Sequence, residues 1–207
     1  IIAGEGAHAT RAQLEAVLPR FIGEIAQIPP MYSALKRDGQ KLCDLARQGI
    51  DVKVEPRPTQ VYAIQVLHEN ADGSFMLQIR CGRGTYIRTL CNDIGEALET
   101  KAHMGVLLRT QTGMFTLDEA HTIEEIDAAE DLTPLLVAMD KPLGHLPRLD
   151  VQPKAERFVR NGNKLTRREL IGDIQPGKPT RLYLNGQFCG IGRFEGENLK
   201  FDAMLLE

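Results

Sequence analysis

The sequence predicts an α+β fold, because two signals for antiparallel hairpins accompany the apolar stripe of an amphipathic helix. The hairpin signals are Asp72-Gly73 and Asn185-Gly186, each of which stands between β-rich runs. The helical signal is an apolar spacing of i, i+3, i+4, i+7 and i+11, carried by Ile87, Leu90, Cys91, Ile94 and Leu98. A chain of 207 residues with 43% hydrophobic residues is long enough to bury a core between such elements.

The first elements are expected to be two short helices with a strand between them. Thr10-Arg11-Ala12-Gln13 has the form of a capping box and predicts a helix that breaks near Pro19. Residues 23–28 follow as a strand. Pro29-Pro30 then forces extended geometry, and the lack of any clear period as far as Gly39 predicts an exposed loop. The second helix has its apolar stripe and its stop signal at Leu42, Leu45, Ala46 and Gly49.

A hairpin and a longer helix come next. The β-rich runs 61–68 and 75–80 flank the Asp72-Gly73 turn, and the helix extends from about Tyr86 to Leu98. The segment 103–115 is expected to be a further strand.

The C-terminal part is expected to be a small β-rich domain that follows a linker at Leu146-Pro147. Before the linker, Thr122-Ile123-Glu124-Glu125 is a second capping box, and Thr133-Pro134 places proline where another helix would begin. After it, a short helix ends near Asn161-Gly162, and Asn185-Gly186 predicts a type I′ hairpin.

Composition excludes several classes of protein. No run approaches the roughly 20 apolar residues of a membrane span, and the first residues lack the features of a signal peptide, so we expect a cytoplasmic protein with no membrane partner. The four cysteines have neither CxxC pairing nor histidines at zinc spacing, so we expect reduced, mostly buried thiols and no metal. The net charge of −3 argues against indiscriminate binding of nucleic acid.

Charge is nevertheless segregated along the chain. Residues 117–140 contain eight acidic and no basic residues, whereas residues 148–181 contain nine basic and four acidic residues. The contrast indicates a solvated acidic segment and a basic face, with ordinary surface variation as the alternative.

The junction between the β-rich run 75–80 and the helix from about Tyr86 carries the most specific chemistry. Gly82 and Gly84 allow close approach of the backbone to a ligand. Arg88 falls in the first helical turn, where a cation opposes the helix dipole, so helix stability does not explain it. An anion would find free N–H groups, the dipole and an arginine together. Tyr86 beside it is able to stack on a base or to transfer a proton near a cation; the alternative is a half-buried aromatic beside a surface arginine.

Three segments, in this order, carry a resemblance: residues 28–36 with Gly39 and 46–49, residues 84–90, and residues 107–110 with Gly113 and Phe115. Together they resemble the TruB family, the bacterial tRNA pseudouridine synthases that act on the T loop. The resemblance implies a pseudouridine-synthase-like fold over residues 1–146, with a mixed, mainly antiparallel sheet and flanking helices. It further implies an RNA-gripping insertion at about 29–55 and a PUA-like RNA-binding domain at 147–207.

The reaction that the resemblance implies is isomerisation of the T-loop uridine at position 55 of tRNA to pseudouridine, by a monomer without a cofactor, after the base is flipped out. Tyr86 would stack on that base, Arg88 would hold the catalytic aspartate ionised, and Leu107 would close the uracil pocket. RNA contacts are expected at Tyr32, Lys36, Arg37, Lys41, Arg47, Arg83, Arg109 and Lys164.

The chain departs from the family pattern at three places. Leu108 stands where the family commonly has an arginine, and Cys43 stands where it often has tyrosine. The Gly-x-Leu-Asp-Pro motif around the nucleophile is absent, and the chain opens without methionine, so we expect a C-terminal portion that is inactive alone. The alternatives are a non-catalytic module that binds or folds tRNA, and a structural protein with no RNA partner.

Overall fold

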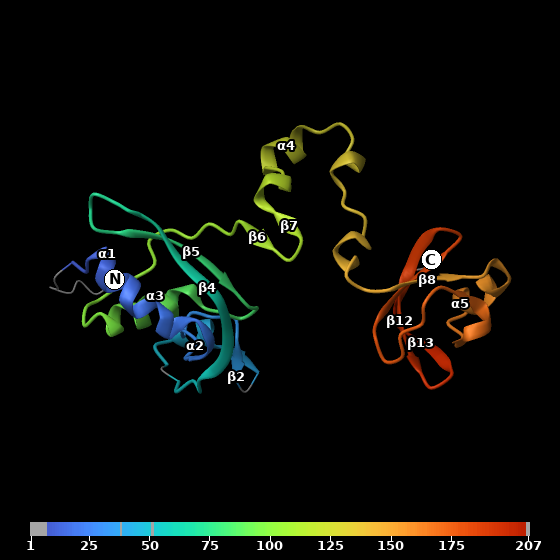
Figure 1. The fold of residues 1–207 in the computed structure, drawn as a ribbon, viewed down its shortest axis with the longest axis horizontal. Helices are drawn as coiled ribbons and strands as arrows, with labels where there is room; N and C mark the ends of the chain where they lie inside the picture. Colours follow the sequence, from blue (N-terminus) through green and yellow to red (C-terminus); the bar gives the residue numbers. More distant parts are fainter. Residues whose placement is uncertain (1–7, 38, 51, 206–207) are drawn as a thin grey trace. The chain divides into compact units, whose positions relative to one another are not determined.

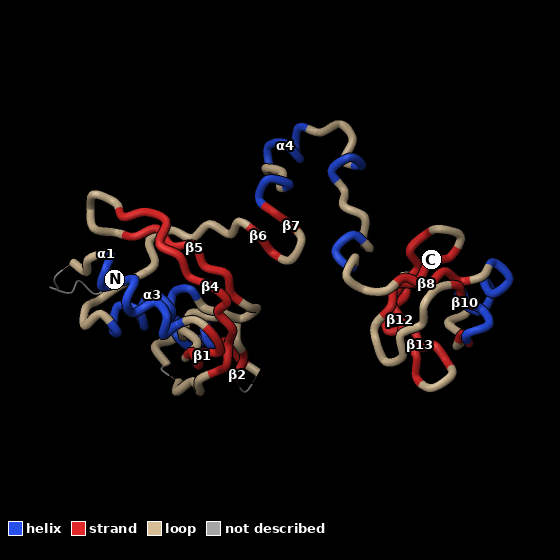
Figure 2. Tube along the Cα trace, viewed as in Figure 1, coloured by secondary structure: helices blue, strands red, loops and turns tan. Residues whose placement is uncertain are grey.

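The computed structural model describes residues 8–37, 39–50 and 52–205, and it divides the chain into two compact units, residues 1–107 and 108–207 (Figure 1). Each unit contains both helices and strands, so the α+β prediction is confirmed (Figure 2).

A three-stranded antiparallel sheet in the order β1-β4-β5 forms the first unit, with two helices packed on it (Figure 1). Leu14 and Val17 of one helix and Leu90 and Ile94 of the other bury their side chains with Val66 of the sheet. The apolar stripe predicted after residue 86 is therefore the face that the helix buries. The elements are α1 (Arg11–Val17), β1 (Gly23–Gln27), β2 (Lys36–Arg37), β3 (Gln40–Lys41), α2 (Leu42–Arg47), β4 (Arg57–Glu69), β5 (Phe75–Cys81) and α3 (Ile87–Ala97).

Local signals fix several of these elements. Both bonds of the Thr10–Gln13 capping box are present at the start of α1. In the β4–β5 turn, Gly73 has a φ of 79°, and the Asp72 carboxylate accepts a bond of 2.9 Å from the Ser74 N–H. The helix predicted after Thr10 and the hairpin predicted at Asp72-Gly73 are therefore confirmed.

The expected loop before Gly39 is more ordered than the sequence predicts. Lys36–Arg37 and Gln40–Lys41 pair as a two-strand ladder, β2 and β3, and α2 follows directly. The pairing adds backbone hydrogen bonds to a segment whose side chains are mostly exposed.

The prediction of a strand at 103–115 is wrong for most of its length. In the described part of the chain, residues 101–110 have no regular secondary structure, and only Gln111–Thr112 and Phe115–Thr116 pair, as the short hairpin β6–β7. Val106 is 91% exposed, so the apolar residues here do not form the buried face of a strand in a sheet. A β-rich run becomes a strand only when another strand lies beside it to accept its hydrogen bonds.

The second unit is built on a six-stranded sheet in the order β10-β8-β11-β12-β13-β9, in which only β8 and β11 are parallel. Asn185 and Gly186 have φ angles of 51° and 80°, which confirms the type I′ hairpin between β11 and β12. The elements are β6 (Gln111–Thr112), β7 (Phe115–Thr116), α4 (Ile123–Ala128), β8 (Arg148–Val151), α5 (Glu156–Arg160), β9 (Leu165–Thr166), β10 (Leu170–Ile171), β11 (Thr180–Leu184), β12 (Gln187–Glu195) and β13 (Asn198–Met204).

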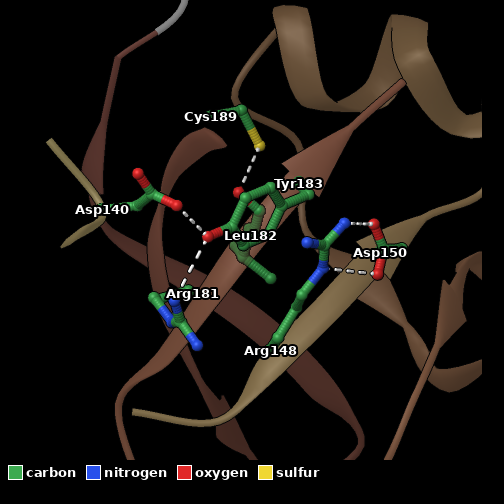
Figure 3. A network of polar contacts seen from close by, with 7 residues as sticks. All are labelled: Asp140, Arg148, Asp150, Arg181, Leu182, Tyr183 and Cys189. Carbon is green, nitrogen blue, oxygen red and sulfur yellow. Dashed lines mark hydrogen bonds and ion pairs between the residues drawn. The ribbon is translucent and has the colours of Figure 1, made fainter. Parts of the chain in front are cut away.

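A polar network holds the segment before β8 on this sheet (Figure 3). The Tyr183 hydroxyl donates to Asp140, and this bond is the main reason that the pKa of the Asp140 carboxyl is lowered. The Arg148 guanidinium lies 3.8 Å from the centre of the Tyr183 ring and pairs with Asp150 at 2.7 Å. Arg181 donates to the Leu146 carbonyl at 3.1 Å. Residues on either side of the predicted linker at 146–147 are thus bonded to the same strand.

All four cysteines are free, but the prediction that they are mostly buried is wrong. Only Cys189 is buried, and burial raises the pKa of its thiol to about 11; the other three are partly exposed. Among the described residues no cluster of His, Cys, Asp or Glu is arranged to hold a metal ion. None of the described helices combines the length and apolarity of a membrane span.

Candidate functional site

The candidate site is the start of α3, where the Gly-rich turn meets the helix. Gly84 has a φ of 88°, a conformation that favours glycine. The Thr85 hydroxyl lies 2.6 Å from the Thr59 hydroxyl of β4 and bonds to the Gly82 carbonyl at 3.0 Å. These bonds attach the turn to the sheet immediately before the helix begins.

Tyr86 is the N-cap residue of α3, and its half-buried side chain makes no capping bond. Its backbone N–H instead donates to the side-chain oxygen of Gln27 at 2.9 Å, and its carbonyl accepts from the Gln27 amide nitrogen at 3.2 Å. Gln27 ends β1 and is only 2% exposed. One buried side chain therefore satisfies both polar backbone groups of Tyr86.

Arg88 and Thr89, in the first turn of α3, bond to the segment that follows β1. The exposed Arg88 guanidinium donates to the Tyr32 carbonyl at 2.9 Å, and the Thr89 hydroxyl donates to the Ile28 carbonyl at 3.3 Å. Tyr32 itself is 60% exposed. The structure thus brings together Tyr32, Tyr86 and Arg88, which the sequence places in two distant motifs.

The small β2–β3 hairpin carries two of the predicted RNA contacts. Lys36 and Lys41 are directly paired across the ladder, and both are exposed. Like charges directly opposite each other destabilise a sheet, so the pairing is better suited to an anionic ligand than to stability. Both lysines line an open pocket with Gly39, Gln40, Asp44 and Gln48.

The other predicted contacts have more varied settings. Arg37 on the same hairpin donates to the Lys53 carbonyl, and Arg47 in the last turn of α2 pairs with Asp44 at 3.3 Å. Arg83 is exposed in the Gly-rich turn. Arg109 and Lys164 are exposed residues of the second unit.

Leu107, predicted to close a base pocket, is 54% exposed and lies in the irregular segment at the end of the first unit. Leu108 and Cys43, the departures from the family pattern, are exposed and partly exposed. The role of Leu107 in closing a uracil pocket stays a prediction.

A carboxylate suited to pair with Arg88 is not found on α3 itself. Burial raises the pKa of Asp93, and the charge of Glu96 raises it further, against the lowering effect of a bond from Asn92. Asp93 is five residues beyond Arg88, roughly 7.5 Å along the helix axis. A nucleophile held ionised by arginine requires the opposite shift.

Sequence reasoning missed two polar residues of this site, Gln27 and Ser33. Gln27 takes a buried position at the end of an alternating strand, where the residue type is unusual, and this was the available signal. Ser33 is 7% exposed, and its hydroxyl has no hydrogen-bond partner in the part of the chain that the structure describes. Ser33 lies within residues 28–36, which carry the resemblance, but the sequence analysis assigned it no role of its own.

Most of the chain is similar to known proteins of one family. Residues 1–87 match the model of the N-terminal domain of TruB family pseudouridylate synthases, and residues 88–143 match that of the tRNA pseudouridylate synthase B C-terminal domain. The tRNA pseudouridine synthase B of Alkaliphilus oremlandii is 43% identical over 195 residues, which cover 92% of this chain and 64% of the relative. That of Clostridium perfringens strain 13 is 36% identical over 205 residues, 98% of this chain and 69% of the relative.

Solved structures show the same fold. A chain of a Cbf5-Nop10-Gar1 complex superposes with a TM-score of 0.68 at 24% identity, over 96% of this chain and 63% of that chain. A chain of an H/ACA RNP bound to a substrate RNA containing 2′-deoxyuridine gives a TM-score of 0.69 at 20% identity, over 97% and 63%. The fold is therefore pseudouridine-synthase-like, and the chain spans roughly two-thirds of the length of these relatives. On the family models and the identity to full-length relatives, this chain belongs to the TruB family of pseudouridylate synthases.

Proposed function

We propose that this chain is part of an enzyme that isomerises the T-loop uridine at position 55 of tRNA to pseudouridine. The observation that carries the proposal is the start of α3, where Gln27 bonds to the backbone of Tyr86 and Arg88 donates to the Tyr32 carbonyl. Family membership supports the reaction type, and the relatives named above are tRNA pseudouridine synthases.

In the proposed reaction the bond between N1 of uracil and C1′ of the ribose breaks, the base turns, and C5 bonds to C1′. C5 then loses a proton and N1 gains one, so the atoms balance without a cofactor. Tyr86 would stack on the flipped base and accept the proton from C5, which returns to solvent. The exposed guanidinium of Arg88 would hold a nucleophilic carboxylate ionised, and Leu107 would close over the uracil.

RNA is the proposed partner. Lys36 and Lys41 of the β2–β3 hairpin would contact phosphates, as would Arg37, Arg47 and Arg83. The exposed Tyr32 ring offers a surface on which a base stacks. Arg109 and Lys164 would extend the contacts from the second unit.

We further propose that this chain alone does not catalyse the reaction. None of its aspartates stands in a Gly-x-Leu-Asp-Pro context, and on α3 Asp93 has a raised pKa. We infer that none of these aspartates is the carboxylate that Arg88 would hold.

The test is incubation of this chain with a T stem-loop RNA, with binding and pseudouridine formation measured in parallel. We expect salt-dependent binding and no pseudouridine. Robust turnover would contradict the proposed inactivity, and lack of binding at low ionic strength would contradict RNA as the partner. If the intact enzyme containing this sequence also binds tRNA but leaves position 55 unmodified, the chain is a non-catalytic RNA-binding module instead.

A further inference from the structure

We infer that Gln27 is a positioning residue for the isomerisation, acting through the backbone of Tyr86. The inference rests on the proposed function, because it assumes that the Tyr86 phenol meets the uracil. It goes beyond that function by assigning a role to a side chain of β1 that lies outside residues 28–36 and 84–90, two of the segments that carry the resemblance.

The backbone N–H at the start of α3 requires an acceptor from outside the helix. The N–H of an N-cap residue has no partner within its own helix, and a capping box satisfies it with a Glu or Gln at the third helical position. That position of α3 is Thr89, whose hydroxyl donates to the Ile28 carbonyl instead. Gln27 supplies the missing acceptor from β1, at 2.9 Å from the Tyr86 nitrogen.

The chemistry of the amide group fits both of its bonds. The Tyr86 N–H needs an acceptor, which fixes the Gln27 oxygen toward it and leaves the NH₂ facing the Tyr86 carbonyl. That carbonyl also accepts the first bond of the helix, from the Leu90 N–H at 3.0 Å, so both of its lone pairs are used. At 2% exposure Gln27 has no water to replace either bond, and removal of the amide leaves both Tyr86 groups short of a partner.

Fixing both backbone groups fixes the direction in which Tyr86 presents its side chain. Its φ of −94° and ψ of 104° are set between the sheet and the helix, and the two bonds to Gln27 hold this geometry from outside the helix. A displacement of the order of 1 Å in a catalytic group is enough to cost about 100-fold in rate. The effect is expected in the chemical step and not in tRNA affinity.

Two variants of the intact enzyme test the role. Gln27→Met keeps the size of the side chain and removes both bonds; we expect the single-turnover rate of pseudouridine formation to fall about 10- to 100-fold, with less than a threefold change in the tRNA dissociation constant. Gln27→Glu replaces the NH₂ with an oxygen that donates to the Tyr86 carbonyl only when protonated. Burial raises the pKa of a carboxyl, so the Glu side chain should become protonated as the pH falls. The rate of the Gln27→Glu variant relative to the unmodified enzyme should therefore rise about tenfold from about pH 8.5 to about pH 5.5.

The matched control is Gln65→Glu, the same change at an exposed position of β4, whose rate ratio should stay flat over that pH range. Hydrogen exchange supplies a second measurement on this chain alone: the Tyr86 amide should lose protection in Gln27→Met. An unchanged single-turnover rate in Gln27→Met, or a flat pH profile in Gln27→Glu, overturns the positioning role. Absence of pseudouridine with the unmodified enzyme contradicts the proposed function instead, so the two failures are distinguishable.

Discussion

Tyr86 owes its position to bonds that its own side chain does not make. Its backbone is held by Gln27 of β1, and its neighbour Arg88 is bonded to the Tyr32 carbonyl. Among the described residues, the Tyr86 side chain makes no capping bond at the start of α3. A residue that is rigidly placed but has a free functional group is what a catalytic role requires.

Replacement of Tyr86 by Phe in the intact enzyme should lower the single-turnover rate at least about 100-fold, because the proton acceptor is lost while the stacking ring remains. The tRNA dissociation constant should change less than about threefold. Quench-flow measurement of pseudouridine and filter binding of tRNA would give the two numbers. Tyr62→Phe, at an exposed tyrosine of β4, is the control. Equal loss of rate and binding in Tyr86→Phe would assign the residue a structural role.

At the scale of elements, local signals predicted structure well wherever the bonds that stabilise an element lie within a few residues. The Thr10–Gln13 box starts α1, and the turn after Asn70 closes β4–β5. The run at 103–115 has the composition of a strand but no partner strand over most of its length in the described chain. Its failure as a prediction has a physical cause, because strand formation depends on a neighbour that composition does not reveal.

Two glycines of the β11–β12–β13 meander should differ sharply in their tolerance of alanine. A Cβ on Gly186 would meet no atom within 4 Å, so only its φ of 80° is strained, which costs about 1 kcal/mol. A Cβ on Gly190 would lie 2.3 Å from the Ala203 carbonyl oxygen, where β12 pairs with β13. We expect Gly190→Ala to destabilise the second unit by about 3 kcal/mol or more.

Labelling of Cys189 under increasing urea would measure this difference, with peptide mass spectrometry to distinguish it from the other thiols. The Cys189 side chain is fully buried, and burial raises its thiol pKa to about 11, so it reacts only when the second unit opens. Gly105→Ala in the first unit, where φ is not positive and no atom lies within 4 Å, should leave the urea midpoint of Cys189 labelling unchanged. Similar urea midpoints for Gly186→Ala and Gly190→Ala would contradict the clash.

At the scale of the whole molecule, a net charge of −3 means that attraction to RNA depends on where the basic residues lie. The β2–β3 hairpin places two exposed lysines opposite each other, and the long acidic run is confined to residues 117–140. Binding of a polyanion by such a chain should be local and should weaken steeply with salt.

Neutralising the paired lysines should therefore reduce the salt dependence of tRNA binding. For Lys36→Gln with Lys41→Gln we expect the slope of log K against log salt concentration to fall by about 0.7 to 0.9 for each lysine, because each phosphate contact releases a counterion. Titrations at several salt concentrations would measure the slope. Lys200→Gln, at an exposed lysine of β13 that lies 3.8 Å from Glu195, is the control. A slope unchanged in the double variant would exclude the hairpin from the RNA interface.

From the sequence alone it was possible to predict the two capping boxes, the two tight hairpins, the position of Tyr86 and Arg88 at the start of one helix, and the resemblance to a family that the relatives confirm. These features depend on hydrogen bonds and apolar spacings within about a dozen residues. Two contacts could be seen in the three-dimensional structure alone: Gln27 holds Tyr86 across 59 positions, and Arg88 donates to the Tyr32 carbonyl across 56. Such pairs form because the β1-β4-β5 sheet brings the end of β1 beside the start of α3, and neither partner carries a local signal of the other.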